Sequence, residues 1–167
     1  MAGRFLDRSV PAMINHRTRL AALAIAVTAA VALPASAQAK TQTLRVFDRP
    51  DMLVLTHADG TVVAHPPFPE AQPGDRLDVY SSVFAGNHAH HSKKAIGSTH
   101  VVCTFSTGPE PDDCVSHVAL GGSMLIFDGD PGTVIAGTGR YLHASGRVIS
   151  SKEVANDGSD VVAKIRF

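Results

Sequence analysis

The sequence is poor in aromatic side chains, and it lacks tryptophan altogether. Aromatic residues make up 5% of the 167 positions, and two of them are tyrosines. A site walled by stacked aromatic rings, as a polycyclic ligand requires, is therefore not expected. From Lys40 onward, 11 lysines and arginines stand against 14 aspartates and glutamates, a net charge of −3. This balance predicts no basic patch for nucleic acid and no polybasic face for anionic lipid.

Familiar catalytic patterns are also missing. No serine stands in a Gly-x-Ser-x-Gly sequence, which argues against a serine hydrolase. The glutamates of residues 40–167 fall in expected loops or at strand ends, with no sign of a paired-carboxylate glycosidase site. The glycine-rich run at 137–139 lacks the lysine and the long helix that a phosphate-binding loop needs.

Residues 1–39 are predicted to be an export signal. Arginines precede an uncharged apolar run, Leu20 to Leu33, which is shorter than the about 20 residues that a membrane span requires. Pro34 ends this run, and small-x-small patterns after it place signal-peptidase cleavage after Ala37 or Ala39. The alternative is an uncleaved anchor helix.

The start of the chain has two candidates, Met1 and Met13, because residues 13–39 alone have the normal proportions of a signal peptide. Residues 40–167 contain no other long apolar stretch. We therefore expect a secreted, extracellular protein of one domain, residues 40–167, which is soluble and free of the membrane once the signal is removed.

Both cysteines, Cys103 and Cys114, lie in this exported part. Export brings them into an oxidising environment, where thiols pair. The segment between them is rich in Gly, Pro and Asp, so a strand, a turn and a second strand would place them side by side. A redox-active or metal-binding thiolate pair is the alternative, but the spacing is not Cys-x-x-Cys. The sequence predicts a disulfide.

No stretch after the signal shows sustained helical periodicity. Short β-prone runs alternate instead with clusters of Gly, Pro and Asp, which is typical of a sandwich or a barrel. About eight strands are expected, linked mostly by short hairpin-like turns, and the first strand is expected to end at Asp48-Arg49-Pro50-Asp51. Alternation predicts one face of Leu77, Val79 and Val83 on a strand at 76–84, and one face of Val161, Ala163, Ile165 and Phe167 on the last strand, at 160–167. Closure removes the exposed edges of such a meander. We predict an all-β fold, a closed antiparallel eight-stranded β-barrel, with a two-sheet β-sandwich as the alternative.

The stretch from Gly74 to Ile149 resembles one family. Its landmarks are Gly74-Asp75, the run Val101-Val102-Cys103-Thr104, and the pair Gly121-Gly122. A Gly-Thr-Gly-x-Tyr-x-x-Ala-x-Gly run follows at 137–146. These motifs, in this order, resemble the allene-oxide-cyclase and dirigent barrel group, in particular its secreted bacterial members.

The resemblance implies an eight-stranded antiparallel barrel with a mostly apolar lumen, often dimeric or trimeric. Enzymes of that group steer a ring closure or a radical coupling without a metal or organic cofactor, by holding a reactive molecule in one conformation. An acidic residue on the first strand commonly polarises the substrate there, and Asp48 holds the corresponding place in this chain.

Five polar residues are the candidates for a site at the lumen mouth. Asp48 is expected to act as base or polariser, Arg140 to stabilise negative charge, and the hydroxyl of Tyr141 to orient the ligand. Tyr80 and His100 complete the ligand-binding set with Tyr141. The proposed ligand is a small apolar molecule.

Two further hypotheses stay open. One is a non-catalytic secreted protein, a carrier, an envelope component or a partner-binding module that reuses the barrel. The other concerns His88, His90 and His91, which could capture a transition metal, although a solvated loop is the expected state of this segment. No metal or organic cofactor is otherwise predicted.

Overall fold

The structure is a computed structural model that describes residues 40–64, 70–111, 113–129, 132–155 and 157–167. The expected export signal and its cleavage positions lie outside the described residues. The strands are β1 (Thr41–Thr56), β2 (Val62–Ala64), β3 (Arg76–Asn87), β4 (His90–His91), β5 (Gly97–Thr104), β6 (Asp113–Leu120), β7 (Ser123–Asp128), β8 (Thr133–Gly137), β9 (Ser145–Val154) and β10 (Gly158–Arg166), with one 3-10 turn, η1 (Gly139–Tyr141). No helix in this part of the chain is long and apolar enough to cross a membrane.

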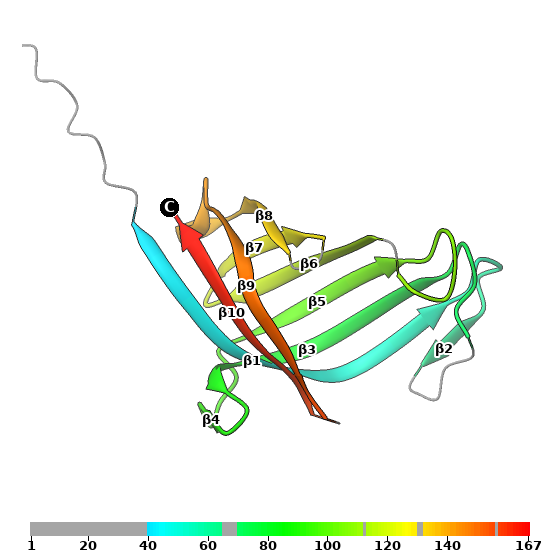
Figure 1. The fold of residues 1–167 in the computed structure, drawn as a ribbon, viewed down its shortest axis with the longest axis horizontal. Coiled ribbons are helices and arrows are strands. Elements are labelled where there is room, and N and C mark those ends of the chain that lie inside the picture. Colours follow the sequence, from blue (N-terminus) through cyan, green and yellow to red (C-terminus); the bar gives the residue numbers. More distant parts are fainter. Residues whose placement is uncertain (1–39, 65–69, 112, 130–131, 156) are drawn as a thin grey trace, which may run out of the picture. The chain divides into compact units, whose positions relative to one another are not determined.

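Strand β1 closes the sheet into a barrel. Its first half pairs with β10 and its second half with β3, so that residues 46–48 pair on both sides. Figure 1 shows β1 as the long curved strand that runs first beside β10 and then beside β3. The ring β1-β10-β9-β8-β7-β6-β5-β3 is antiparallel throughout, and β2 and β4 add to it at the side. The predicted eight-stranded closed barrel is confirmed.

One predicted boundary is wrong. Asp48-Arg49-Pro50-Asp51 was expected to end the first strand, but β1 continues through it to Thr56. Proline cannot donate to a ladder and is therefore confined to edges and bulges. Pro50 stands at such a place, because the register with β3 shifts between Pro50 and Met52. Here β1 has already left β10, which it pairs with only as far as Asp48.

The strand register fixes which side chains point into the barrel. On β3, the predicted face of Leu77, Val79 and Val83 lies inward, while the alternate residues lie outward. On β10, Val161, Ala163 and Ile165 share the inward face, as expected. Val83 and the three β10 side chains join a single apolar cluster whose fully buried members include Leu125, Tyr141 and Ile165.

Cys103 and Cys114 stand directly opposite each other on β5 and β6 and form the predicted disulfide. Both residues belong to the inward-facing register, and Cys103 is buried. The bond therefore joins two neighbouring strands on the inner face of the barrel.

Candidate functional site

A cavity of about 330 Å³ lies inside the barrel. Its wall comes from β1, β5, β6, β7, β9 and β10, together with two glycines that flank the β7–β8 turn. The lining residues are Leu44, Val46, Asp48, Thr99, Val101, Cys114, Ser116, Val118, Phe127, Gly129, Gly132, Val148, Ser151, Ser159 and Val161. Small-molecule sites commonly occupy about 300–1,000 Å³, are mostly apolar and carry a few polar groups, and this cavity fits that description.

Asp48 enters the cavity because of strand alternation. Leu44, Val46 and Asp48 occupy every second position of β1, and all three line the lumen. The register places Ser159 of β10 opposite Asp48 on one side and Val83 of β3 on the other. Among the described residues Asp48 is the one titratable group of the wall, since Cys114 is oxidised.

The environment of Asp48 disfavours its charge. Burial raises the pKa of the Asp48 carboxyl above its usual range, and the nearby hydroxyls of Thr99 and Ser81 offset this only in part. Oδ1 of Asp48 and Oγ of Ser81 are buried, and neither atom forms a hydrogen bond of regular geometry within the described part of the chain. A buried polar atom without a partner is uncommon, and it is one sign of a site that awaits a ligand.

Arg140 and Tyr141 lie away from this cavity, in η1. The Tyr141 ring is buried at the end of the barrel, edge-on to Phe167 with ring centroids 6.0 Å apart. The Arg140 guanidinium lies over the same ring, 4.7 Å from its centroid. The Tyr141 hydroxyl is buried, and no partner for it occurs in the ranges that the structure covers. Tyr141 thus fills the end of the barrel. The structure does not bring Arg140 and Tyr141 together with Asp48, as the sequence had suggested.

Tyr80 and His100 face outward. They stand opposite each other on β3 and β5, and their rings stack at 4.4 Å between centroids. Nε2 of His100 lies 2.8 Å from Oδ1 of Asp78, which Arg76 also contacts at 2.6 Å. The Arg76 and His100 bonds lower the pKa of the Asp78 carboxyl against the opposing effect of its burial. The structure therefore gives these two residues a place on the outer wall and not at the lumen.

The three neighbouring histidines do not converge. The Nδ1 of His88 lies 2.8 Å from Asp160, and that of His91 lies 2.9 Å from the backbone oxygen of Ser92. The backbone N–H of His90 donates to the side chain of Asn87. Across the described ranges, no group of three His, Cys, Asp or Glu side chains is arranged to hold a metal ion.

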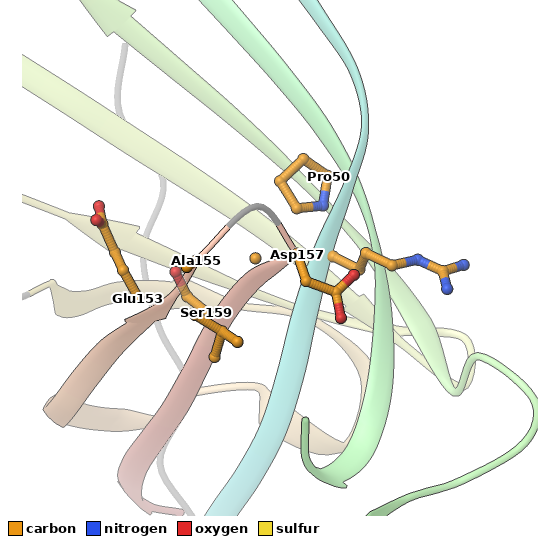
Figure 2. Close-up of a pocket in the computed structure, with 8 residues that line it drawn as sticks. Pro50, Glu153, Ala155, Asp157 and Ser159 are labelled. Atoms are coloured by element: carbon orange, nitrogen blue, oxygen red, sulfur yellow. The ribbon is translucent and has the colours of Figure 1, made fainter. Parts of the chain in front are cut away.

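A second hollow, of about 440 Å³, lies at the tip of the β9–β10 hairpin against β1. Its wall includes Pro50, Glu153, Ala155, Asp157 and Ser159 (Figure 2). Figure 2 shows the carboxyls of Glu153 and Asp157 pointing in different directions, so they do not converge on one ligand atom. Ser159 also lines the lumen cavity, which places the two hollows next to each other. We therefore assign the candidate site to the lumen.

Sequence reasoning missed the hydroxyls of the lumen. Thr99, Ser116, Ser151 and Ser159 all line the cavity, yet none stands in a motif. They could have been found only by knowing which alternate positions of each strand point inward. Serine and threonine are as common on the outer face of a strand as on the inner one. Once Asp48 is known to point inward, the register identifies its neighbours directly.

No protein-family model and no curated protein sequence matches the chain. Solved structures do match. A pyocyanin demethylase superposes with a TM-score of 0.55 and 17% identity, over 74% of this chain and 99% of its own. Two pterocarpan synthase dirigent proteins, PsPTS1 and GePTS1, follow with TM-scores of 0.49 and 0.44 and identities of 17% and 16%. They cover 77% of this chain in each case, and 95% and 89% of their own.

At such identities the likeness to the demethylase concerns the fold alone. It agrees with the strand pairing, which independently closes eight strands into a ring. The chain is an eight-stranded antiparallel barrel of the fold that its sequence resemblance to the dirigent and allene-oxide-cyclase group implied.

Proposed function

We propose that the barrel binds a small, mostly apolar molecule in its lumen and exchanges a proton with it through Asp48. The observation that carries this proposal is the buried, unpartnered Oδ1 of Asp48 on the wall of an otherwise apolar and hydroxyl-bearing cavity. We further propose that this occurs outside the cytoplasm, after export. The disulfide supports that location, because such bonds persist in oxidising compartments.

The wall limits the charge of the ligand. No lysine, arginine or histidine of the described residues lines the cavity, while one carboxyl does. An anionic group would be desolvated there without a cationic partner, which is costly. The lumen therefore favours a neutral or cationic molecule that can donate a hydrogen bond to Asp48.

The proposed chemistry is a proton transfer coupled to a rearrangement. Asp48, as carboxylate, takes a proton from an O–H, N–H or activated C–H of the ligand, and the bond's electron pair stays on the ligand. That electron pair attacks an electrophilic atom of the same molecule and closes a ring. The electron pair displaced from the electrophile then takes the proton back from Asp48, so the reaction is an isomerisation and the protein is unchanged. A raised pKa suits this exchange, because the acid and base forms then lie closer in energy near neutral pH.

By its name, the demethylase of similar fold acts on pyocyanin, which supports chemistry on a small molecule as a role for such a barrel. A non-catalytic carrier is the second candidate. The observation in its favour is that Arg140 and Tyr141 lie away from Asp48, which leaves one titratable group at the lumen in the part of the chain described.

Native mass spectrometry of the exported protein tests binding first. We expect a stoichiometric organic adduct on the wild type, and the same spectrum reports whether the subunit count is the two or three implied by the resemblance. Val118→Phe fills the lumen and should remove the adduct. Ile126→Phe, which faces outward on β7, is the matched control and should keep it. An adduct that survives Val118→Phe would contradict the proposal that the ligand binds in the lumen.

The released adduct then serves as substrate for Asp48→Asn. Conversion by the wild type and not by the variant, with binding retained in both, supports proton exchange at Asp48. Binding in both proteins without any conversion identifies a carrier.

A further inference from the structure

The outer wall of the barrel carries a third hollow, of about 490 Å³, over β9 and β10. It forms where β8 and β9 hold together by a single residue pair, Thr133 with Arg147. Its wall consists of Thr41, Thr133, Ser145, Gly146, Arg147, Ile149, Lys164, Ile165 and Arg166. Because the inward Ile165 is almost fully buried, its neighbours Lys164 and Arg166 point outward into this hollow.

The charges of this hollow have one sign. Arg147, Lys164 and Arg166 line it, and no acidic residue of the described chain does. None of the three takes part in an ion pair with another described residue. Asp128, the acid at the end of β7, pairs with Thr133 and is separated from Arg147 by β8. Three of the 11 cations of residues 40–167 thus gather in one place on a domain of net charge −3.

The barrel holds two of these cations against each other. Arg147 and Lys164 are direct cross-strand partners on β9 and β10. Like charges directly opposite on one face of a sheet destabilise it. The neighbouring Gly146 keeps the strands close, because a Cβ there would lie 2.1 Å from the backbone oxygen of Lys164. A repulsive pair held at close range, with no acid of the described chain between its members, is the arrangement that an anion relieves.

Hydroxyl donors complete the set. Thr41, Thr133 and Ser145 stand on the same wall, and all three are exposed. Arginine presents a fork of N–H donors that matches a phosphate, and lysine adds a compact positive charge. Three cations and three hydroxyls exceed what the two oxygens of a carboxylate can accept, but they suit the three or four oxygens of a phosphate or sulfate group.

We propose that this outer hollow binds the oxyanion of a phosphate or sulfate group. Composition predicted no basic patch for nucleic acid and no polybasic face for anionic lipid, and these three cations become neighbours only through strand pairing. The site is independent of the lumen, where the Asp48 carboxyl disfavours anions. The group can belong to a free phosphate or sulfate ester or to an anionic lipid, since both present the same oxygens.

The test uses the exported full chain, uniformly labelled with ¹⁵N. Sodium phosphate is titrated against sodium chloride of equal ionic strength, and amide chemical shifts are recorded. Arg147→Gln with Lys164→Gln removes two charges from the hollow. Lys93→Gln with Lys94→Gln is the matched control, because these exposed lysines lie in the β4–β5 connection.

We expect phosphate-specific shifts at residues 145–147 and 164–166, and about tenfold weaker binding in the hollow variant but not in the control. Shifts that chloride reproduces, or that the hollow variant retains in full, would overturn the proposal. A second arm separates the sources, with sedimentation against phosphatidylglycerol or phosphatidylcholine vesicles. Sedimentation with the anionic vesicles alone, lost in the hollow variant, assigns a lipid headgroup. Phosphate binding without sedimentation assigns a soluble ester.

Discussion

His88 and Asp160 join two elements that are far apart in the chain, on the outer wall of the barrel. The backbone N–H of His88 donates to one carboxyl oxygen of Asp160 at 2.6 Å, and its Nδ1 lies 2.8 Å from the other. Beneath this contact, Phe47 is almost fully buried, with the His91 ring 5.3 Å away between centroids. The histidine cluster thus covers an outward-facing phenylalanine.

This contact predicts an acid-sensitive contribution to stability. The His88 side-chain bond holds the pKa of the Asp160 carboxyl below its usual range. A carboxyl whose pKa is lowered by folding stabilises the folded state above the unfolded pKa of about 3.9. That stabilisation is lost as the pH falls through the lower, folded value. Asp160→Asn should therefore cost roughly 1 kcal/mol at pH 7, and the difference from the wild type should shrink below about pH 4.

Urea unfolding at a series of pH values measures this difference. Asp113→Asn is the control, because Asp113 is exposed at the start of β6 and forms no ion pair within the described residues. A difference between wild type and Asp160→Asn that stays constant from pH 7 to pH 3 would contradict the assignment.

Gly158 permits the close approach of β10 to β1 at Asp48. Its φ is +126°, and a Cβ there would lie 2.1 Å from the backbone oxygen of Asp48. Gly158→Ala should destabilise the protein by about 1–3 kcal/mol through backbone strain, with the steric clash in addition. Gly108→Ala, where a Cβ meets nothing within 4 Å, should change stability by less than about 0.5 kcal/mol. Equal unfolding midpoints for the two variants would show that the approach is not as close as described.

The disulfide should contribute strongly to stability. Cys103→Ser with Cys114→Ser removes a bond between directly opposed residues of β5 and β6. Releasing that constraint on the unfolded chain should cost about 2–4 kcal/mol. Guanidinium unfolding of the variant, and of the wild type in a reducing agent, measures the loss. The two should agree, and an unchanged midpoint in both would mean that strand pairing alone holds this wall.

Much of the barrel could be predicted from local patterns. The alternation along β3 and β10 identified their two faces correctly, and the short Cys loop predicted the disulfide. The missed boundary at Pro50 has a physical cause. A proline normally ends a strand, but here β1 changes partners, and the bulge after Pro50 accommodates the missing donor.

The candidate site was only partly predictable. The resemblance pointed to an acid on the first strand, and the structure places Asp48 on the wall of the lumen cavity. Tyr80 and His100 were expected at the lumen as well, but the alternation of side chains along β3 and β5 places both on the outer face. The basic hollow was invisible to composition, since Arg147, Lys164 and Arg166 become neighbours only through the pairing of β9 with β10.

Asp48→Asn gives a prediction that separates a functional carboxyl from a structural one. Because folding raises the pKa of Asp48, the folded state binds more protons than the unfolded state as the pH rises from about 4. Stability contributed by this group therefore falls through that range, and at pH 7 its ionisation opposes folding. Asn carries no charge to desolvate, so the variant should be more stable than the wild type at pH 7 and should lose that advantage at pH 3.

Asp128→Asn, at an exposed carboxyl that ends β7, should not show this pattern. Urea midpoints at the two pH values separate a functional Asp48 from a structural one. A gain in stability at pH 7, together with lost conversion of the bound molecule, means that the barrel tolerates an unfavourable carboxyl for its chemistry. A loss of stability at pH 7 means that Asp48 is held in place by the lumen wall as part of the fold.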